Sequence, residues 1–220
     1  MRTLAAVVAI TLLAGCPRKA PIRPQAFDKG QKGAILSFQA PPKITPWAPP
    51  GTPGPEFDAA PVLAELRPIV IEALAKNPHF SLVAEAKVFA APAYKAHPGD
   101  PSGFISPTGY KAVTNEALYP QLAREAGADM GMGLALSLVY RGEDGAAAVV
   151  LGVGAIDTQG RGVWKGGAAA VSDRPVDVRT ASPRQRLEAF KDAARKAMAE
   201  LEENMAANLA VEGAQIRTGH

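Results

Sequence analysis

The fold of this chain is decided by residues 122–171, which read LAREAGADMGMGLALSLVYRGEDGAAAVVLGVGAIDTQGRGVWKGGAAAV. Gly127 is placed to end a helix, and within residues 129–140 the apolar residues fall on every second position, the spacing of one face of a β-strand. The glycine-containing turns at 141–145 and 158–160 can take the positive φ that tight hairpins need. The stretch therefore predicts a helix end followed by three strands. Small residues in the second and third strands predict helices packed closely against them.

The residues before this stretch supply the other elements of one domain. Residues 33–38 predict a first strand and residues 79–84 a second one. Between them, apolar residues within 60–76 recur every three or four positions, so we predict a helix that either kinks at Pro68 or begins there. A strand, a helix and a strand in this order favour a parallel pair joined by a right-handed crossover. A further helix is predicted at 115–126.

Proline and glycine separate these elements. The proline-rich residues 41–57 and the Pro-, Gly- and Ser-rich residues 92–109 predict long surface loops, because such compositions do not form regular helix. After the strands, residues 182–185 (Ser-Pro-Arg-Gln) form a capping box that starts a helix with one apolar stripe and a face of mixed charge. We predict that this helix packs on the sheet rather than on a membrane surface, and that residues 212–220 form a flexible tail.

Composition limits what the chain can be. Its 220 residues, 47% of them apolar, suffice for one well-buried domain with extensions. The net charge of +3 is small, and lysine and arginine do not gather into a dense block, so nucleic-acid binding is not predicted. The single cysteine excludes an internal disulfide and a metal cluster held by thiols.

The first sixteen residues indicate export and a lipid anchor. Arg2 precedes an apolar run, Leu4–Leu13, that is too short to span a bilayer and has the character of a signal-peptide core. Residues 13–16 (Leu-Ala-Gly-Cys) resemble the lipobox of bacterial lipoprotein precursors, a class in which the chain is cut before the cysteine and acyl chains such as palmitate are attached to it. We therefore predict a signal peptide at residues 1–15 and a lipidated Cys16. An ordinary signal peptide with a chance cysteine is the alternative.

A proline-rich tether is predicted to follow the anchor. Residues 16–32 lead to a domain at 33–211, and in an extended conformation of about 3.1 Å per residue the tether reaches roughly 50 Å. The domain would then stay near its own membrane. In lipoproteins, Asp after the cysteine is the familiar signal for the inner membrane. Pro17 occupies that position here, which implies the outer membrane, with the domain in the periplasm.

The order of the predicted elements resembles a family of periplasmic lipoprotein domains. The resemblance rests on the strand that ends at Phe38, the strand Phe80–Val83, the helix end Leu122–Asp129 and the Gly162–Trp164 of the last strand, and it covers about residues 33–210. The family includes the curli-secretion lipoprotein, the outer-membrane activator of penicillin-binding proteins and the amino-terminal domain of the Tol-system propeller protein. It implies an α/β three-layer sandwich with a mixed central sheet, anchored at the outer membrane, that binds other proteins and is not an enzyme.

A search for catalytic chemistry yields no candidate residues. The three histidines have no metal-ligand spacing, and no Gly-x-Ser-x-Gly elbow occurs. Residues 152–154 (Gly-Val-Gly) lie inside a predicted strand without the third glycine of a dinucleotide loop. We therefore predict no catalytic residue, no metal and no cofactor. The alternatives are a cell-wall hydrolase or ligand-binding lipoprotein, and an oligomeric secretion component.

Four aromatic residues in or beside the predicted loops are the candidates for a docking surface. They are Trp47, Tyr94, Phe104 and Tyr110. Aromatic anchors are favoured at protein interfaces, so these side chains are predicted to contact an envelope protein. The alternative is that they fold back and cover the core.

Overall fold

The computed structural model describes residues 22–24, 27, 30–48, 52–99 and 103–218, with side chains described up to residue 210. The elements are β1 (Gln31–Gln39), β2 (Lys43–Trp47), β3 (Phe57–Asp58), α2 (Ala60–Ala75), β4 (Phe80–Leu82), α3 (Glu85–Ala90), α4 (Pro92–Ala96), the 3-10 helix η2 (Glu116–Leu118), α5 (Tyr119–Ala126), β5 (Met130–Arg141), β6 (Ala147–Asp157), β7 (Gly162–Val171) and α6 (Pro183–Thr218). The predicted signal peptide and Cys16 lie outside the described residues.

The sheet is organised around β5, its longest strand. On one side β5 pairs antiparallel with β6 over its whole length, and β6 in turn pairs antiparallel with β7. On the other side, β1 runs parallel to the first half of β5 and β2 runs parallel to its last three residues. β4 joins β1 in parallel, and β3 joins β2 antiparallel. The predicted parallel pair around α2 is therefore confirmed, in a mixed sheet.

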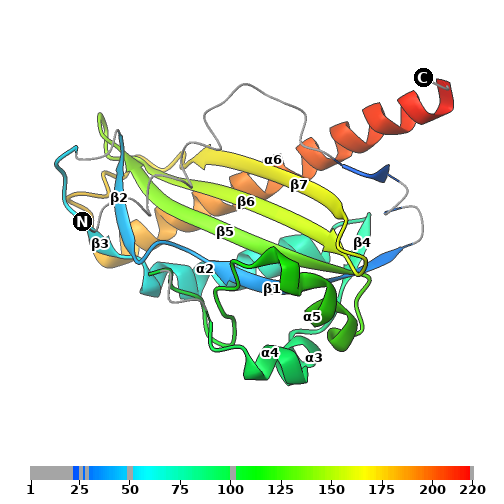
Figure 1. Cartoon of the computed structure of the whole chain (residues 1–220). Coiled ribbons are helices and arrows are strands. Elements are labelled where there is room, and N and C mark those ends of the chain that lie inside the picture. The colour runs from blue at the N-terminus through cyan, green and yellow to red at the C-terminus, as the bar shows by residue number, and fades with distance from the viewer. Residues whose placement is uncertain (1–21, 25–26, 28–29, 49–51, 100–102, 219–220) are drawn as a thin grey trace.

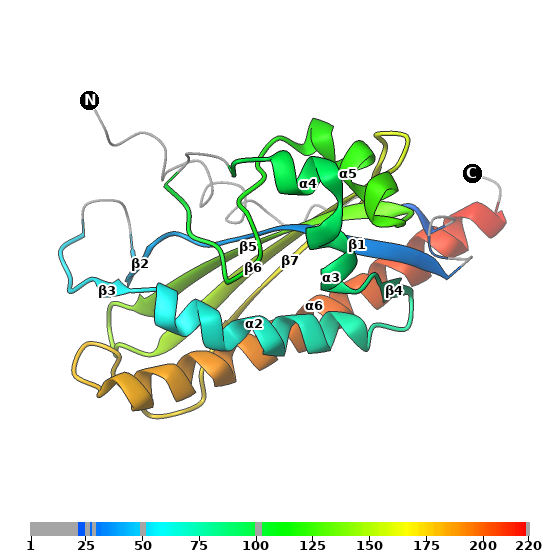
Figure 2. The same cartoon turned by 90° about the horizontal axis from the view of Figure 1, so that it is seen from below.

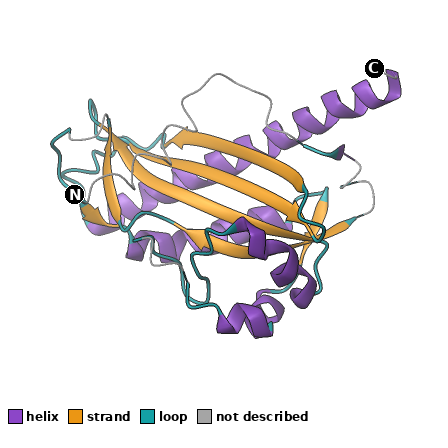
Figure 3. Cartoon of the chain, in the orientation of Figure 1, coloured by secondary structure: helices purple, strands orange, loops and turns teal. Residues whose placement is uncertain are grey.

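Helices cover both faces of this sheet. Figures 1 and 2 show α2 and α6 side by side on one face and α3, α4 and α5 grouped on the other. Figure 3 shows that the two layers of helices enclose one continuous layer of strands. The predicted α/β three-layer sandwich with a mixed central sheet is confirmed.

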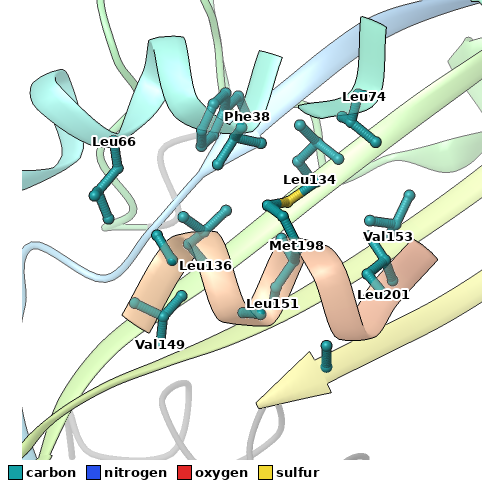
Figure 4. Close-up of a cluster of buried hydrophobic side chains, with 14 of the residues drawn as sticks. Phe38, Leu66, Leu74, Leu134, Leu136, Val149, Leu151, Val153, Met198 and Leu201 are labelled. Atoms are coloured by element: carbon teal, nitrogen blue, oxygen red, sulfur yellow. The ribbon is translucent and has the colours of Figure 1, made fainter. Parts of the chain in front are cut away.

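The larger core lies between the sheet and the pair formed by α2 and α6. Figure 4 shows Leu134 and Leu136 of β5, Leu151 of β6, Leu66 of α2 and Met198 of α6 converging in this layer. Each of these side chains is buried, and full burial of one such side chain stabilises a fold by about 1.5–3 kcal/mol. This layer therefore supplies most of the hydrophobic stabilisation.

The capping box predicted at the start of α6 is present. The Ser182 amide donates to Oε1 of Gln185 at 3.1 Å, and the Gln185 amide donates to Oγ of Ser182 at 3.4 Å. The two bonds satisfy backbone and side-chain groups that a free helix end leaves open. From there α6 continues to Thr218, past residue 211 where the sequence predicted it to give way to a flexible tail.

The helix predicted to pack on the second and third strands is α6, which lies against both β6 and β7. On the opposite face, it is glycines of β5 that let a helix approach closely. A Cβ placed on Gly131 would lie 2.4 Å from Cδ1 of Leu36, and one on Gly133 would lie 2.4 Å from Oη of Tyr119, at the start of α5. At Gly152 and Gly154 of β6 the nearest atoms would be 3.9 and 3.7 Å away, which is ordinary contact. On this face the close approach of a helix is therefore made at β5 and not at β6.

Two predicted loops contain regular structure. Residues 43–47 form β2, although they include Pro46. β3 pairs only with Lys43 and Ile44, so Pro46 has a strand partner on the β5 side alone and occupies a locally open edge, where proline is tolerated. Residues 92–96 form α4, with Pro92 in its first turn, where no donor is needed. The helices α3 and α4 were missed because each has only about one turn and neither has a side-chain cap.

Pro68 does not start a helix, so the second of the two predicted alternatives is wrong. It lies inside α2, which runs from Ala60 to Ala75. Pro68 and Ala64 are both exposed, so the carbonyl that loses its helical donor is on the solvent side and can bond to water.

Candidate functional site

Trp47 forms the centre of the strongest candidate surface. It is the last residue of β2, in register with Arg141 at the end of β5, and 44% of its surface is exposed. Among the described residues it is the one large hydrophobic side chain that is exposed. Charged residues of both signs surround this part of the fold, namely Lys43, Glu56, Asp58, Arg141, Glu143 and Asp144. We call the surface formed by β2, β3, the hairpin 142–146 and the loop 173–182 the Trp47 end.

A rigid aromatic layer lies beneath the Trp47 end. The Tyr140 ring is buried, packs edge-on against Phe57 with 6.3 Å between ring centroids, and its hydroxyl donates to the carbonyl of Pro55 at 2.9 Å. Burial raises the pKa of Tyr140, so its hydroxyl stays a neutral donor. On the other side of Phe57, the guanidinium of Arg186 lies 3.6 Å from the ring centroid, a cation–π contact.

A second set of contacts fixes the loop that completes this end. Asp177 accepts from the Arg179 amide and from Nε and Nη2 of the same residue, at 2.8–2.9 Å, and this pairing holds the pKa of the Asp177 carboxyl below its usual value. Nη1 of Arg179 donates to the carbonyl of Gly142, and the Val178 amide donates to the carbonyl of Gly145, both near 2.9 Å. The loop is therefore bonded to the β5–β6 hairpin at two points.

The other predicted docking aromatics do not join this surface. Tyr94 and Tyr110 are only 1% and 7% exposed, and both pack against Phe89, with ring centroids 5.9 and 5.0 Å away. We correct the docking assignment of these two residues, because they cover the core. Phe104 is half-buried and lines a hollow of about 500 Å³ together with Tyr110 and Lys111.

Lys111, which lines the hollow, caps the C-terminal end of α4 with its side chain. Nζ of Lys111 donates to the carbonyls of Tyr94 at 2.6 Å, Lys95 at 3.1 Å and His97, all at the C-terminal end of α4, where a cation is favoured. Burial raises the pKa of Tyr94 to about 12, and burial together with Glu85 raises the pKa of Tyr110. Both tyrosines are therefore neutral structural groups near pH 7.

Acidic and histidine side chains do not gather in the described part of the chain. The described residues that line the hollow include no carboxylate and no imidazole. Across the described ranges, no group of three or more His, Cys, Asp or Glu side chains could hold a metal ion. The hollow therefore does not offer the converging acidic or histidine side chains that a wall hydrolase would need.

The start of the described chain is docked on the sheet, where the sequence predicted a free tether. Ile22 forms an antiparallel bridge with Trp164, and the Arg23 amide donates to the carbonyl of Val163 at 2.9 Å. Phe27 is buried against Phe80, which in turn packs on Trp164, with ring centroids 6.5 and 6.4 Å apart. We call Ile22, Arg23 and Phe27 the N-terminal clamp. Ile22 and Phe27, two apolar side chains in the proline-rich stretch, are the sequence signal for this docking.

No helix within the described ranges combines the length and the apolar character needed to cross a bilayer.

Comparison with known proteins finds similar solved structures only. No protein-family model matches the chain, and the search of curated proteins finds no match either. The C-terminal domain of LpoB from Escherichia coli is 19% identical, with a TM-score of 0.37, and the match covers 74% of this chain and 91% of that one. The PelC dodecamer from Paraburkholderia phytofirmans is 15% identical, with a TM-score of 0.33 and coverage of 81% and 93%.

A third similar structure is lipoprotein GNA1162 from Neisseria meningitidis, 16% identical, with a TM-score of 0.35 and coverage of 71% and 88%. By name, two of these similar structures are a domain of LpoB and a lipoprotein. At such identities and TM-scores they decide nothing about what this chain binds.

Proposed function

We propose that this chain is a lipoprotein of the outer membrane, anchored through acyl chains on Cys16, whose periplasmic domain acts by binding an envelope protein and not by catalysis. The lipobox at residues 13–16 supports the anchor, and the sequence resemblance supports the mode of action. Several acyl chains on one residue anchor a protein durably, since each buried methylene adds about 0.8 kcal/mol of membrane affinity.

The observation that carries the docking proposal is the exposure of Trp47 on a rigid base. Tryptophan, tyrosine and arginine dominate the binding energy of protein interfaces, and an anchor held in place before binding loses little conformational entropy. Tyr140, Phe57 and the Asp177–Arg179 pair hold the strand and loops around Trp47 in place. Phe104 is a second candidate contact, because it is half-buried at the rim of the Lys111 hollow.

The test is site-specific photocrosslinking of the intact lipoprotein in its own envelope. A photoreactive amino acid is placed at position 47, and at Lys165 of β7 as the matched control, since Lys165 is also exposed but lies toward the other end of the sheet. We expect a discrete crosslinked partner from position 47 and none from position 165. The same partner must be lost when an unmodified Trp47→Ala variant is crosslinked chemically and recovered from the envelope.

Two results would overturn the docking proposal. One is equal partner recovery from wild type and Trp47→Ala, and the other is the same crosslink pattern from positions 47 and 165. Phe104→Ala, tested in parallel, shows whether the hollow contributes to the same contact. The anchor is tested separately by mass analysis of the mature amino terminus, where an unmodified Cys16 would exclude lipidation.

A further inference from the structure

The N-terminal clamp shortens the free part of the predicted tether. Ile22 and Arg23 are paired with Trp164 and Val163 of β7, so Ile22 is the first described residue that is fixed to the domain. Only residues 17–21 separate this fixed point from Cys16. Because an extended chain advances at most about 3.3–3.6 Å per residue, the backbone of Ile22 lies within about 22 Å of that of Cys16.

The clamp is located at one end of the sheet. Trp164 is in register with Ala155, and Ala155 with Met132, near the beginning of β5, whereas Trp47 is in register with Arg141 at the end of β5. Nine residues of strand, at about 3.3 Å each, place the two rows about 30 Å apart. Figure 1 shows β4 at one end of the sheet and β2 and β3 at the other.

The clamp is an integral part of the fold. Ile22 and Phe27 are both buried, and Phe27, Phe80 and Trp164 form a continuous row of aromatic rings. The Arg23 amide bond extends the hydrogen bonding of β7 by one step. Pro21, which lacks an N–H, cannot donate the next backbone bond in that direction. We call residues 17–21, which join Cys16 to the clamp in the sequence, the leash.

From this geometry we infer that the end of the domain formed by β4, the start of β1, the turn 158–161 and the N-terminal clamp faces the lipid surface, and that the Trp47 end is directed away from it. The inference rests on the proposed lipidation of Cys16, because the leash has this consequence only when its far end is held in a bilayer. The exposed side chains at the lipid-facing end are polar, as Ser81 and Gln159 illustrate, and suit contact with lipid headgroups. A partner must then reach the Trp47 end from the periplasmic side.

The test measures the distance of each end from a bilayer. Cys16 is the only cysteine, and its thiol is blocked by acylation, so a dye can be attached to a single introduced thiol in Ser81→Cys or in Glu143→Cys. Both positions are exposed, one on β4 and one in the β5–β6 hairpin. The purified lipoproteins are inserted into phosphatidylethanolamine–phosphatidylglycerol vesicles that contain a headgroup-labelled acceptor lipid, and energy transfer is recorded.

We expect transfer to be several-fold more efficient from position 81 than from position 143. A flexible Gly-Ser linker of about 20 residues inserted after Arg18 should remove the difference, because the leash no longer limits the domain. Ile22→Ser with Phe27→Ser, which opens the clamp, should reduce the difference in part. Equal transfer from both positions in the parent protein, or a difference that survives the linker, overturns the inference.

Failure of the anchor gives a different result. If wild-type protein takes up the thiol dye at Cys16 or fails to float with vesicles, lipidation itself is excluded and the proposed function fails with it. If wild type is unreactive and floats, while positions 81 and 143 behave alike, only the orientation is wrong.

Discussion

The two tryptophans of this chain have opposite surroundings. Trp164 lies inside β7, is 3% exposed, and is covered by Ile22, Phe80 and the side chains of α6 near Met198. Trp47 ends a five-residue strand and is 44% exposed. The first lies where the strands, α6 and the N-terminal clamp meet, and the second lies at the end of the sheet. The comparison separates a tryptophan that stabilises the fold from one that is free to bind.

The strongest test of this comparison is Trp164→Ala, which we expect to destabilise the domain most. Removing a buried tryptophan leaves a cavity and typically costs about 3–5 kcal/mol. Here the substitution also removes the ring contact with Phe80 and changes the residue that pairs with Ile22 of the clamp. Urea unfolding of the mature chain, with Cys16→Ser to keep it free of lipid, measures the change.

Trp164→Phe is the matched control for that experiment and should recover most of the lost stability, because an aromatic ring still fills the space. A loss well below 1 kcal/mol for Trp164→Ala would show that the clamp and α6 close over the gap. Trp164 would then not be the residue that stabilises the fold, and the contrast with Trp47 would be wrong.

The parts of the fold that the sequence predicted well have strong local signals. The strands expected at 129–140, 146–157 and 161–171 are observed within one residue as β5, β6 and β7. Gly145 and Gly160 have φ of +70° and +82°, as the hairpin turns require, and Gly127 ends α5 at φ +73°. Alternation of apolar residues and turn glycines suffice here, because neighbouring residues determine the pairing.

The clamp is the next part of the comparison to test, through Phe27→Ala. Loss of this buried ring should cost about 2 kcal/mol, less than Trp164→Ala, since Phe27 is smaller and, at 8%, more exposed than Trp164 at 3%. We also expect faster hydrogen exchange at the Arg23 amide, whose bond to the Val163 carbonyl depends on the clamp remaining closed.

Phe104→Ala is the control for the clamp, because Phe104 lies in a different loop and its removal should leave exchange at Arg23 unchanged. If Phe27→Ala leaves both stability and exchange as in wild type, the pairing of Ile22 with Trp164 is enough to keep the clamp on β7. Residues 17–21 would still be the leash.

What the sequence did not show depends on contacts between distant residues. β2 was hidden because Pro46 and its short length argue against a strand, while its place beside β5 is fixed by the rest of the sheet. Tyr110 was expected at an interface, but Phe38 and Phe89 bury it. Trp47 could be predicted as exposed, but the rigid layer beneath it could not, because Phe57, Tyr140 and Arg186 come from three separate elements.

At the Trp47 end, the Asp177–Arg179 pair makes a smaller contribution that depends on pH. The pKa of the Asp177 carboxyl in the folded state lies below the usual value of Asp, chiefly because the Arg179 side chain donates hydrogen bonds to the carboxylate. The stabilisation is therefore complete above about pH 4 and is lost as the pH falls through the folded pKa. Asp177→Asn should lower the unfolding midpoint at neutral pH by less than Phe27→Ala does, since the pair is partly exposed and screened by salt.

The measurement for Asp177→Asn is the difference in unfolding midpoint from wild type as a function of pH. The difference should shrink below about pH 4, where the wild-type carboxylate takes up its proton. Asp144, Asp157 and Asp192 also have lowered pKa values, so the wild type loses stability in acid in either case, and only the difference is diagnostic. Glu143→Gln, in the adjoining hairpin, is the control and should show no such trend.

Trp47→Ala should have the smallest effect on stability and the largest on binding. Trp47 is 44% exposed, and substitutions at surface positions usually change the free energy of unfolding by no more than about 0.5 kcal/mol. Urea unfolding of Trp47→Ala should therefore match wild type, whereas crosslinking to the envelope partner is lost. A large loss of stability would mean that Trp47 helps to hold β2 on β5, and any loss of binding would then follow from a disordered edge. Trp47→Phe distinguishes the two cases, because a ring that only anchors a partner can be replaced in part by a smaller ring without any change in unfolding.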